Sequence, residues 1–181
     1  MTATEQVILV DLNDNPVGIA EKIHAHQHNL CHRAFSVFIL KMVETTPQVL
    51  LQQRANSKYH SAGLWTNTCC SHPRPNEDTL VAAKRRLMEE MNIDTPLESL
   101  GWFHYIAHFE NGLVENEIDH VLIGFANENQ IIHPNPAEVQ NYRWISISEL
   151  KKELAKHPKQ FTPWLSEALQ MVEKHFATPA L

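Results

Sequence analysis

The sequence is poor in cysteine, with only 3 among its 181 residues. Two of them, Cys69 and Cys70, are adjacent, and neighbouring cysteines pair only in a strained ring, so a disulfide framework is excluded. The chain also lacks an apolar run long enough to span a bilayer, and its first residues carry no basic segment followed by a long apolar one. We therefore expect a cytoplasmic protein with no membrane partner.

Positive charge is also scarce, with 15 Lys and Arg against 21 Asp and Glu and a formal net charge of −6. A nucleic-acid binder needs a basic face to displace counterions from phosphates, so we expect no nucleic-acid partner. A small anionic ligand held by a few local Lys and Arg side chains is compatible with this charge. Histidine, by contrast, is abundant, with 12 residues. Imidazoles occur on surfaces as well as at metal sites, so their positions must distinguish the two.

Apolar patterning predicts strands on both sides of a helix. Residues 5–10, 33–42 and 48–54 are short apolar runs, and the last two are predicted to form an antiparallel pair. Asn111-Gly112 is a turn signal between two further long strands. The pattern predicts strands at residues 99–110, 114–127 and 142–147.

Three helices are predicted from periodicity and end signals, at residues 76–91, 148–157 and 163–176. Asn76 and Ser148 are the candidate N-caps, and Pro163 lies in the first turn of the last helix. The 43% hydrophobic content over 181 residues is enough for one sizeable core. We therefore expect one domain over residues 1–181, of α/β (α+β) class, with a mixed sheet packed between helices.

Residues 55–75, ANSKYHSAGLWTNTCCSHPRP, form a long segment without a helix or strand pattern. A loop of that length inside a compact domain is usually functional or disordered, and the Trp and Cys content argues against disorder. If this segment is extended, consecutive side chains diverge. Cys70 then shares a side with His72, and Cys69 points toward the interior.

The helix at residues 76–91 carries adjacent carboxylates, Glu89 and Glu90, one turn after Arg86. Adjacent carboxylates can hold Mg²⁺, which in turn binds phosphate oxygens, although an exposed i,i+4 ion pair has the same spacing. The wider pattern resembles the Nudix box, by which that superfamily binds metal diphosphates. It consists of Ser71, Glu77, Arg85, Leu87, Glu89, Glu90 and Ile93.

The match to the Nudix box departs from the family pattern at three positions. Ser71 stands where the first glycine is expected, Arg86 where a metal-binding glutamate is expected, and Asn92 where the closing glycine is expected. Hydrolases of this superfamily use several carboxylates to collect the metal ions that activate water. Replacing one carboxylate by a positive charge favours a domain that binds a diphosphate without cutting it.

A second group of potential ligands is spread along the chain. Glu115 and Glu117 are two residues apart in a predicted strand, so both point to the same face. Carboxylates facing a core are costly unless they are paired or coordinated. Three imidazoles and two carboxylates suit a five- or six-coordinate site for Mn²⁺, Zn²⁺ or Mg²⁺. The candidate ligands are His26, His32, His72, Glu115 and Glu117.

Five motifs, HRAFSVFIL, WTNTCCSHP, RRLMEEM, VENEID and TPW, occur in the order and approximate spacing of the type I isopentenyl diphosphate isomerases. The chain resembles that family from VILVD to TPWL, which is nearly its whole length. The resemblance implies a Nudix-like core at about residues 30–165 and an N-terminal extension that contributes to the active site. It also implies interconversion of isopentenyl and dimethylallyl diphosphate through a carbocation-like intermediate, in isoprenoid biosynthesis.

The resemblance also implies roles for individual residues. Cys70 and Glu117 match the catalytic pair, Tyr105 matches a residue that assists proton delivery at the glutamate, and Trp164 matches the ring that faces the cation. The family's Mn²⁺, Zn²⁺ or Mg²⁺ site matches His26, His32, His72, Glu115 and Glu117. Glu90 matches the ligand of a Mg²⁺ that bridges to the diphosphate, and the residues that bind its oxygens match Lys22, Arg54, Lys58 and Arg86.

Some alternatives stay open at this point. His26 is preferred to His24 and His28 only by its offset from Glu21-Lys22. Trp164 and Tyr105 also suit core packing. A Nudix-type diphosphohydrolase and a noncatalytic metal-binding domain are the competing functions. The expected partner is a small-molecule diphosphate, and the expected state is a monomer or weak homodimer.

Overall fold

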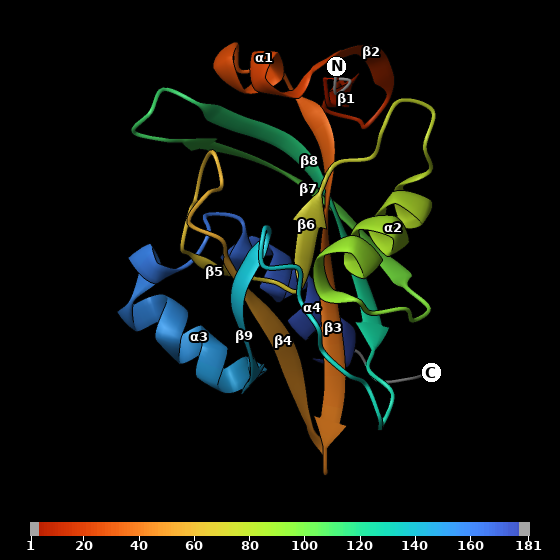
Figure 1. The fold of residues 1–181 in the computed structure, drawn as a ribbon, viewed down its shortest axis with the longest axis vertical. Coiled ribbons are helices and arrows are strands. Elements are labelled where there is room, and N and C mark those ends of the chain that lie inside the picture. Colours follow the sequence, from red (N-terminus) through yellow and green to blue (C-terminus); the bar gives the residue numbers. More distant parts are fainter. Residues whose placement is uncertain (1–3, 178–181) are drawn as a thin grey trace.

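The structure, a computed structural model, describes residues 4–177, and within them the chain forms a nine-stranded mixed sheet with helices on both faces (Figure 1). The strands are β1 (Gln6–Val10), β2 (Pro16–Glu21), β3 (His32–Val43), β4 (Thr46–Arg54), β5 (Trp65–Thr66), β6 (Cys69–Ser71), β7 (Glu98–His108), β8 (Val114–Phe125) and β9 (Val139–Ser146). The helices are α1 (Lys22–Gln27), α2 (Thr79–Met91), α3 (Ile147–Lys156), the short 3-10 helix η1 (Pro158–Gln160) and α4 (Leu165–Ala177). This mixed sheet between helices confirms the predicted fold class.

Strand β3 is the centre of the sheet. It pairs in parallel with β8 over most of its length, and β7 and β8 form the predicted antiparallel hairpin. On its other edge β3 pairs antiparallel with β6 and then with β4, and β4 in turn pairs with β9 and β5. Strands β6 and β8 therefore flank β3 from opposite sides.

Alternation along β3 divides its side chains between two apolar clusters. Phe35, Val37 and Ile39 pack with residues of α2 on one face. Phe38 and Leu40 pack with residues of α3 and α4 on the other face. This two-residue period is what a strand buried between helix layers requires. Among residues 4–177, no helix has the length and apolar character needed to cross a membrane.

The ends of the helices differ from the predicted ones. Helix α2 is capped by Asp78, whose carboxylate accepts hydrogen bonds from the amides of Leu80 and Val81, whereas Asn76 lies before the helix at φ 63°. Helix α3 is capped by Ser146 rather than Ser148, because the backbone turns directly from β9 into the helix. Pro163 lies just before α4 and not in its first turn.

The segment at residues 55–75 is more regular than the sequence pattern predicted. It contains β5 and β6, and β6 pairs with β3 so that Ser36 faces Cys70 and Val37 faces Cys69. Helix α1, which the sequence pattern did not predict, has only six residues and is too short to show periodicity. It lies with β1 and β2 at one end of the sheet (Figure 1).

Candidate active site

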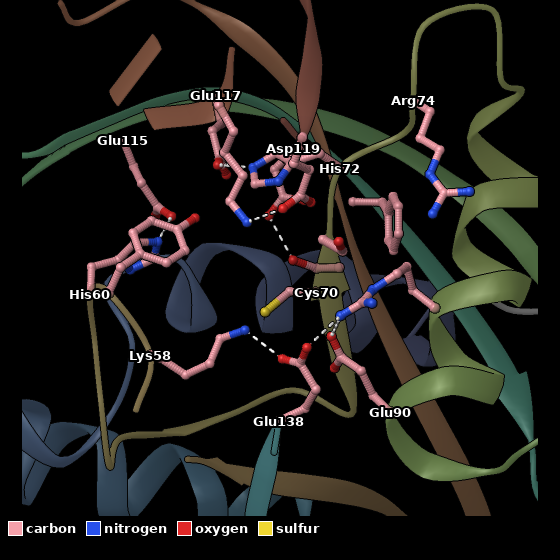
Figure 2. A pocket seen from close by; sticks show the side chains of 18 of the residues that line it. Lys58, His60, Cys70, His72, Arg74, Glu90, Glu115, Glu117, Asp119 and Glu138 are labelled. Carbon is pink, nitrogen blue, oxygen red and sulfur yellow. Dashed lines mark hydrogen bonds and ion pairs between the residues drawn. The ribbon is translucent and has the colours of Figure 1, made fainter. Parts of the chain in front are cut away.

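A cavity of about 540 Å³ lies at the end of the sheet where β3 begins. Its walls come from β3, β4, β6 and β8, from the start of β1 and of α1, from the segment before β5, and from α2. Figure 2 shows Cys70 pointing into it, with Glu117 and Asp119 on one side and Lys58 and Glu138 on the other. The described structure thus gathers side chains that are far apart in the sequence.

Three of the candidate histidines and Glu117 form one cluster. The ligand atoms of His26, His32, His72 and Glu117 all lie within 4.8 Å of one another. His32 Nε2 is 3.1 Å and His72 Nε2 is 2.9 Å from the same oxygen, Glu117 Oε1. His26 is buried here, whereas His24 and His28 are exposed on the other side of α1. Of these three histidines, His26 is therefore the one that the fold places in the cluster.

Backbone carbonyls orient two of these rings. The Nδ1–H groups of His26 and His32 can donate to the carbonyl oxygens of Lys22 and Leu30, at 2.7 and 2.8 Å. With Nδ1 as the donor to the backbone, the Nε2 atom of each ring is the one that would offer a lone pair to a cation, which is the usual arrangement of histidine ligands. His26 Nε2 is buried and has no hydrogen-bond partner. This unsatisfied nitrogen and the facing carboxylate fit a divalent cation.

Burial and neighbouring charges set the protonation of this cluster. Burial, assisted by His32 and His72, lowers the pKa of His26 to about 3, so its imidazole is neutral. Burial acts to raise the pKa of Glu117, but hydrogen bonds from His32 and His72 overcome it and hold that pKa well below its usual range. Burial also lowers the pKa of His72, whereas at His32 the hydrogen bond and the charge of Glu117 outweigh burial and raise the pKa. Metal binding requires neutral imidazoles beside an ionised carboxylate, so a cation would displace the extra proton of His32.

Tyr105, on β7, contacts Glu115 and Glu117 on the neighbouring strand β8. Its hydroxyl lies 2.7 Å from Glu115 Oε2 and 2.5 Å from Glu117 Oε2, and Tyr105 is directly opposite Glu117 in the β7–β8 register. Burial raises the pKa of Tyr105 well above its usual range, so the phenol keeps its proton. Tyr105 therefore has one hydroxyl hydrogen to donate, and both carboxylates lie within its reach.

The two adjacent cysteines point in opposite directions, as predicted. Cys69 is fully buried in the apolar cluster beneath α2, and Cys70 lines the cavity. Burial raises the pKa of the Cys70 thiol to about 12, although the Arg54 guanidinium, 3.7 Å from its sulfur, acts in the other direction. All three cysteines are free, in agreement with the expected absence of a disulfide.

The opposite side of the cavity carries an ion-pair network. Arg86 lies 2.7 Å from Glu90 and 3.3 Å from Glu138, and Lys58 also pairs with Glu138. The second oxygen of Glu90 accepts a hydrogen bond of 2.9 Å from the side chain of Gln52. The i,i+4 pair predicted on α2 is therefore present, and it faces the cavity rather than solvent.

Lys22 and Trp164 complete the set of predicted residues in the cavity wall. Lys22 lies 2.7 Å from Glu5 and 4.7 Å from the centre of the Tyr59 ring. Trp164 is 3% exposed and donates its indole N–H to Asn67 at 3.1 Å. It is thus both buried and cavity-lining, so the two alternatives left open by the sequence are not exclusive.

Several cavity residues were not predicted. Asp119 continues the two-residue period of Glu115 and Glu117 on β8, so that period could have revealed it. One of its oxygens accepts a 2.7 Å hydrogen bond from Ser36, and the other is buried without a partner. His60 and Glu138 lie outside any regular pattern, and only the folded chain brings them to the cavity.

Comparison with known proteins agrees with this fold. The NUDIX domain family matches residues 32–165. A solved structure of a Deinococcus radiodurans protein superimposes with a TM-score of 0.73 at 17% identity, covering 92% of this chain and 98% of that one. A Caenorhabditis elegans Ap4A hydrolase superimposes with a TM-score of 0.60 at 20% identity, covering 80% of this chain and 97% of that one. The chain has a NUDIX domain.

Sequence relatives define the family more narrowly. Isopentenyl-diphosphate Delta-isomerase 2 of Aromatoleum aromaticum is 45% identical over 93% of this chain and 86% of its own length. Isopentenyl-diphosphate Delta-isomerase of Photobacterium profundum is 47% identical over 95% of this chain and 96% of its own length. The chain belongs to the isopentenyl-diphosphate Delta-isomerase family, as the sequence motifs predicted.

Proposed function

We propose that this enzyme interconverts isopentenyl diphosphate and dimethylallyl diphosphate by moving protons on carbon. The observation that carries the proposal is the placement of Cys70 and Glu117 in the wall of one cavity, with the Tyr105 hydroxyl 2.5 Å from Glu117. They come from β6 and from the β7–β8 hairpin, on either side of β3. A proton donor and a proton acceptor that flank a substrate are what this reaction needs.

The reaction requires one proton to enter the substrate and one to leave. A proton added to the terminal alkene carbon leaves positive charge on the adjacent tertiary carbon, and loss of a proton from carbon 2 forms the new double bond. We assign proton delivery to the Tyr105–Glu117 side, where the Tyr105 hydroxyl carries the proton beside Glu117. We assign proton removal to Cys70, which must react as a thiolate, and the Arg54 guanidinium 3.7 Å from its sulfur favours that form against the effect of burial. In the reverse reaction the two groups exchange roles.

The positive charge that develops on the substrate needs a stabilising wall. The buried indole of Trp164 offers a π face to the cavity, and a desolvated cation–π contact contributes about 2 kcal/mol. Glu117 and Trp164 belong to the buried part of the wall, and limited access of water there would favour loss of a proton over addition of water.

We propose that a divalent cation, Mn²⁺, Zn²⁺ or Mg²⁺, is held by His26, His32, His72, Glu115 and Glu117. When bound, it supplies positive charge beside Glu117 and raises the acidity of neighbouring protons. The chain's own groups hold the carboxylate in place through His32 and His72. His26 comes from α1, so the N-terminal extension contributes to the site within one domain of residues 1–181.

We further propose that the diphosphate binds at the basic side of the cavity, with Mg²⁺ between its oxygens and Glu90. Arg86, which departs from the hydrolase pattern, becomes a bidentate donor to phosphate oxygens. The ion pairs of Arg86 and Lys58 with Glu138 keep both cations facing the cavity. The proposed oxygen-binding residues are Lys22, Arg54, Lys58 and Arg86.

The finer properties of the protein follow the same proposal. The cytoplasm suits an enzyme with two adjacent cysteines that must stay reduced. We propose a monomer or weak homodimer. We propose neither nucleic-acid nor membrane partners, because the net charge is −6.

Incubation with isopentenyl diphosphate and Mg²⁺ in D₂O tests the activity. We expect dimethylallyl diphosphate that carries deuterium, measured by NMR and mass spectrometry, and no released phosphate. A diphosphohydrolase would release phosphate and would not depend on Cys70. Phosphate release without isomerisation, or neither product, would reject the proposal.

A further inference from the structure

His60 occupies a fixed place in the cavity wall that the sequence pattern did not predict. It lies between β4 and β5 and is 6% exposed. Its carbonyl oxygen accepts a hydrogen bond of 3.2 Å from Arg54, and the carbonyl oxygen of Tyr59 accepts one of 3.0 Å from Asn111. The backbone around His60 is therefore held from β4 on one side and from the β7–β8 turn on the other.

Neighbouring rings fix the plane of the His60 imidazole. It stacks on Phe109 with ring centroids 4.8 Å apart and an interplanar angle of 20°, and it lies nearly parallel to His26 at 5.7 Å and 26°. In this orientation Nε2 lies 2.8 Å from Glu115 Oε1. The ring is thus built into the wall with one nitrogen directed at a buried carboxylate.

Counting donors shows why Glu115 needs this nitrogen. Tyr105 has one hydroxyl hydrogen, and two carboxylates, Glu115 and Glu117, lie within reach of it. Glu117 has two further imidazole partners, at His32 and His72. Glu115 is 3% exposed, and a buried carboxylate without donors is strongly destabilised. His60 is the additional partner that the described contacts give it.

We propose that His60 is a positioning residue of the metal centre, donating its Nε2–H to Glu115 so that this carboxylate faces the proposed cation. Glu115 Oε1 lies 3.9 Å from His26 Nε2, the buried nitrogen without a partner. The ligand atoms of His26, His60 and Glu115 lie within 4.8 Å of one another. The inference rests on the metal site proposed above and adds to it a residue outside the five expected ligands.

This role gives His60 a second consequence for the reaction. With Glu115 satisfied by His60, the single proton of Tyr105 is free to serve Glu117, where proton delivery is assigned. His60 therefore acts through Glu115, and it sets which carboxylate the Tyr105 hydroxyl serves. Hydrogen bonds that orient ligands in this way affect metal affinity by about 10- to 100-fold.

Two substitutions separate positioning from packing. His60→Gln removes the ring but keeps an amide N–H near the position of Nε2, whereas His60→Phe keeps a stacking ring against Phe109 and removes the donor. We expect His60→Phe to weaken Zn²⁺ binding by about 10- to 100-fold and His60→Gln to change it by no more than about 3-fold. A role in packing alone predicts the reverse order, and that result would overturn the proposal. Direct ligation by His60 would make both variants weak, which would also overturn it.

The measurement is the Zn²⁺ dissociation constant of the purified full chain, from competition with a chromogenic chelator, with thermal unfolding recorded for every variant. His24→Phe, which changes an exposed histidine of α1, is the matched control and should bind as the unchanged protein does. His72→Ala should lose tight binding. If it does not, the metal site itself is wrong and the His60 role fails with it. If His72→Ala loses the metal and His60→Phe does not, only the His60 role is rejected.

Discussion

The two ends of strand β8 share one backbone but differ in what they bury. Its first half places Glu115, Glu117 and Asp119 at the cavity, and its second half places Val121 and Ile123 in the apolar cluster with α4. Both halves pair with β3 in the same parallel register, from His32–Glu117 to Phe38–Ile123. Buried ionisable groups oppose folding, and apolar burial offsets this. The comparison shows that the ionisable side chains of β8 are concentrated at the cavity end, whereas the apolar side chains that stabilise the fold are at the other end.

The strongest test of this division is Cys70→Ala at the cavity end. We expect isomerisation to fall below detection, because the proposed proton acceptor is lost, while the fold and the bound metal are unchanged. Product formation from isopentenyl diphosphate, circular dichroism and elemental analysis measure the three properties. Activity close to that of the unchanged enzyme would show that the reacting group has been misassigned.

Ile123→Ala tests the opposite end of the same strand. Ile123 is 1% exposed, and removing such a side chain leaves a cavity that lowers the free energy of unfolding by about 3 kcal/mol. Urea unfolding measures this loss. The specific activity of the folded fraction should stay within about 2-fold of the original, because a core truncation of this kind leaves the cavity residues in place. A large loss of activity without a loss of stability would contradict the division.

Acid should weaken the cavity end of the metal-free protein. His26 has a pKa of about 3 in the folded state against 6.5 in the unfolded chain, so between these values the unfolded state binds the extra proton. The contribution of His26 to the free energy of unfolding is therefore fully present above pH 6.5 and is lost as the pH is lowered toward 3. At pH 5 the loss from this group is about 2 kcal/mol. Urea unfolding at several pH values should show a shallower fall for His26→Gln. Equal slopes for both proteins would exclude His26 as the cause.

The smallest effect is expected for Cys69→Ala, on the core face of β6. Cys69 is fully buried beneath α2, where a thiol behaves as a small apolar group. The substitution should lower the free energy of unfolding by about 1 kcal/mol and leave turnover unchanged. Comparable turnover of the Cys69 and Cys70 variants would contradict the assignment of Cys69 to the core and of Cys70 to the reaction.

Local patterns in the sequence were sufficient for much of the fold. Apolar runs predicted β3 and β4, the Asn111-Gly112 turn predicted the β7–β8 hairpin, and periodicity predicted α2, α3 and α4. The helix caps were less predictable, because Asn76 and Asp78 are both good capping residues and the backbone angle decides between them.

The site was predictable only where family motifs or strand periodicity extend to it. The motifs named the residues that the structure gathers around the cavity, including His26, for which spacing alone left two alternatives. His60 and Glu138 carry no such signal, because they come from irregular segments that tertiary contacts place. Asp119 did have a signal, since it shares the face of Glu115 and Glu117 on β8.

The parallel pairing of β3 with β8 has a consequence for how the enzyme is made. His32 and Glu117 are opposite each other in that pairing although 85 residues separate them in the chain. Contacts of such long sequence separation form late, because the entropy cost of closing a large loop must be met before these contacts contribute any stabilisation. During synthesis the ribosome must therefore release β8 before the cation site can exist, so a nascent chain that ends before residue 114 should capture no metal.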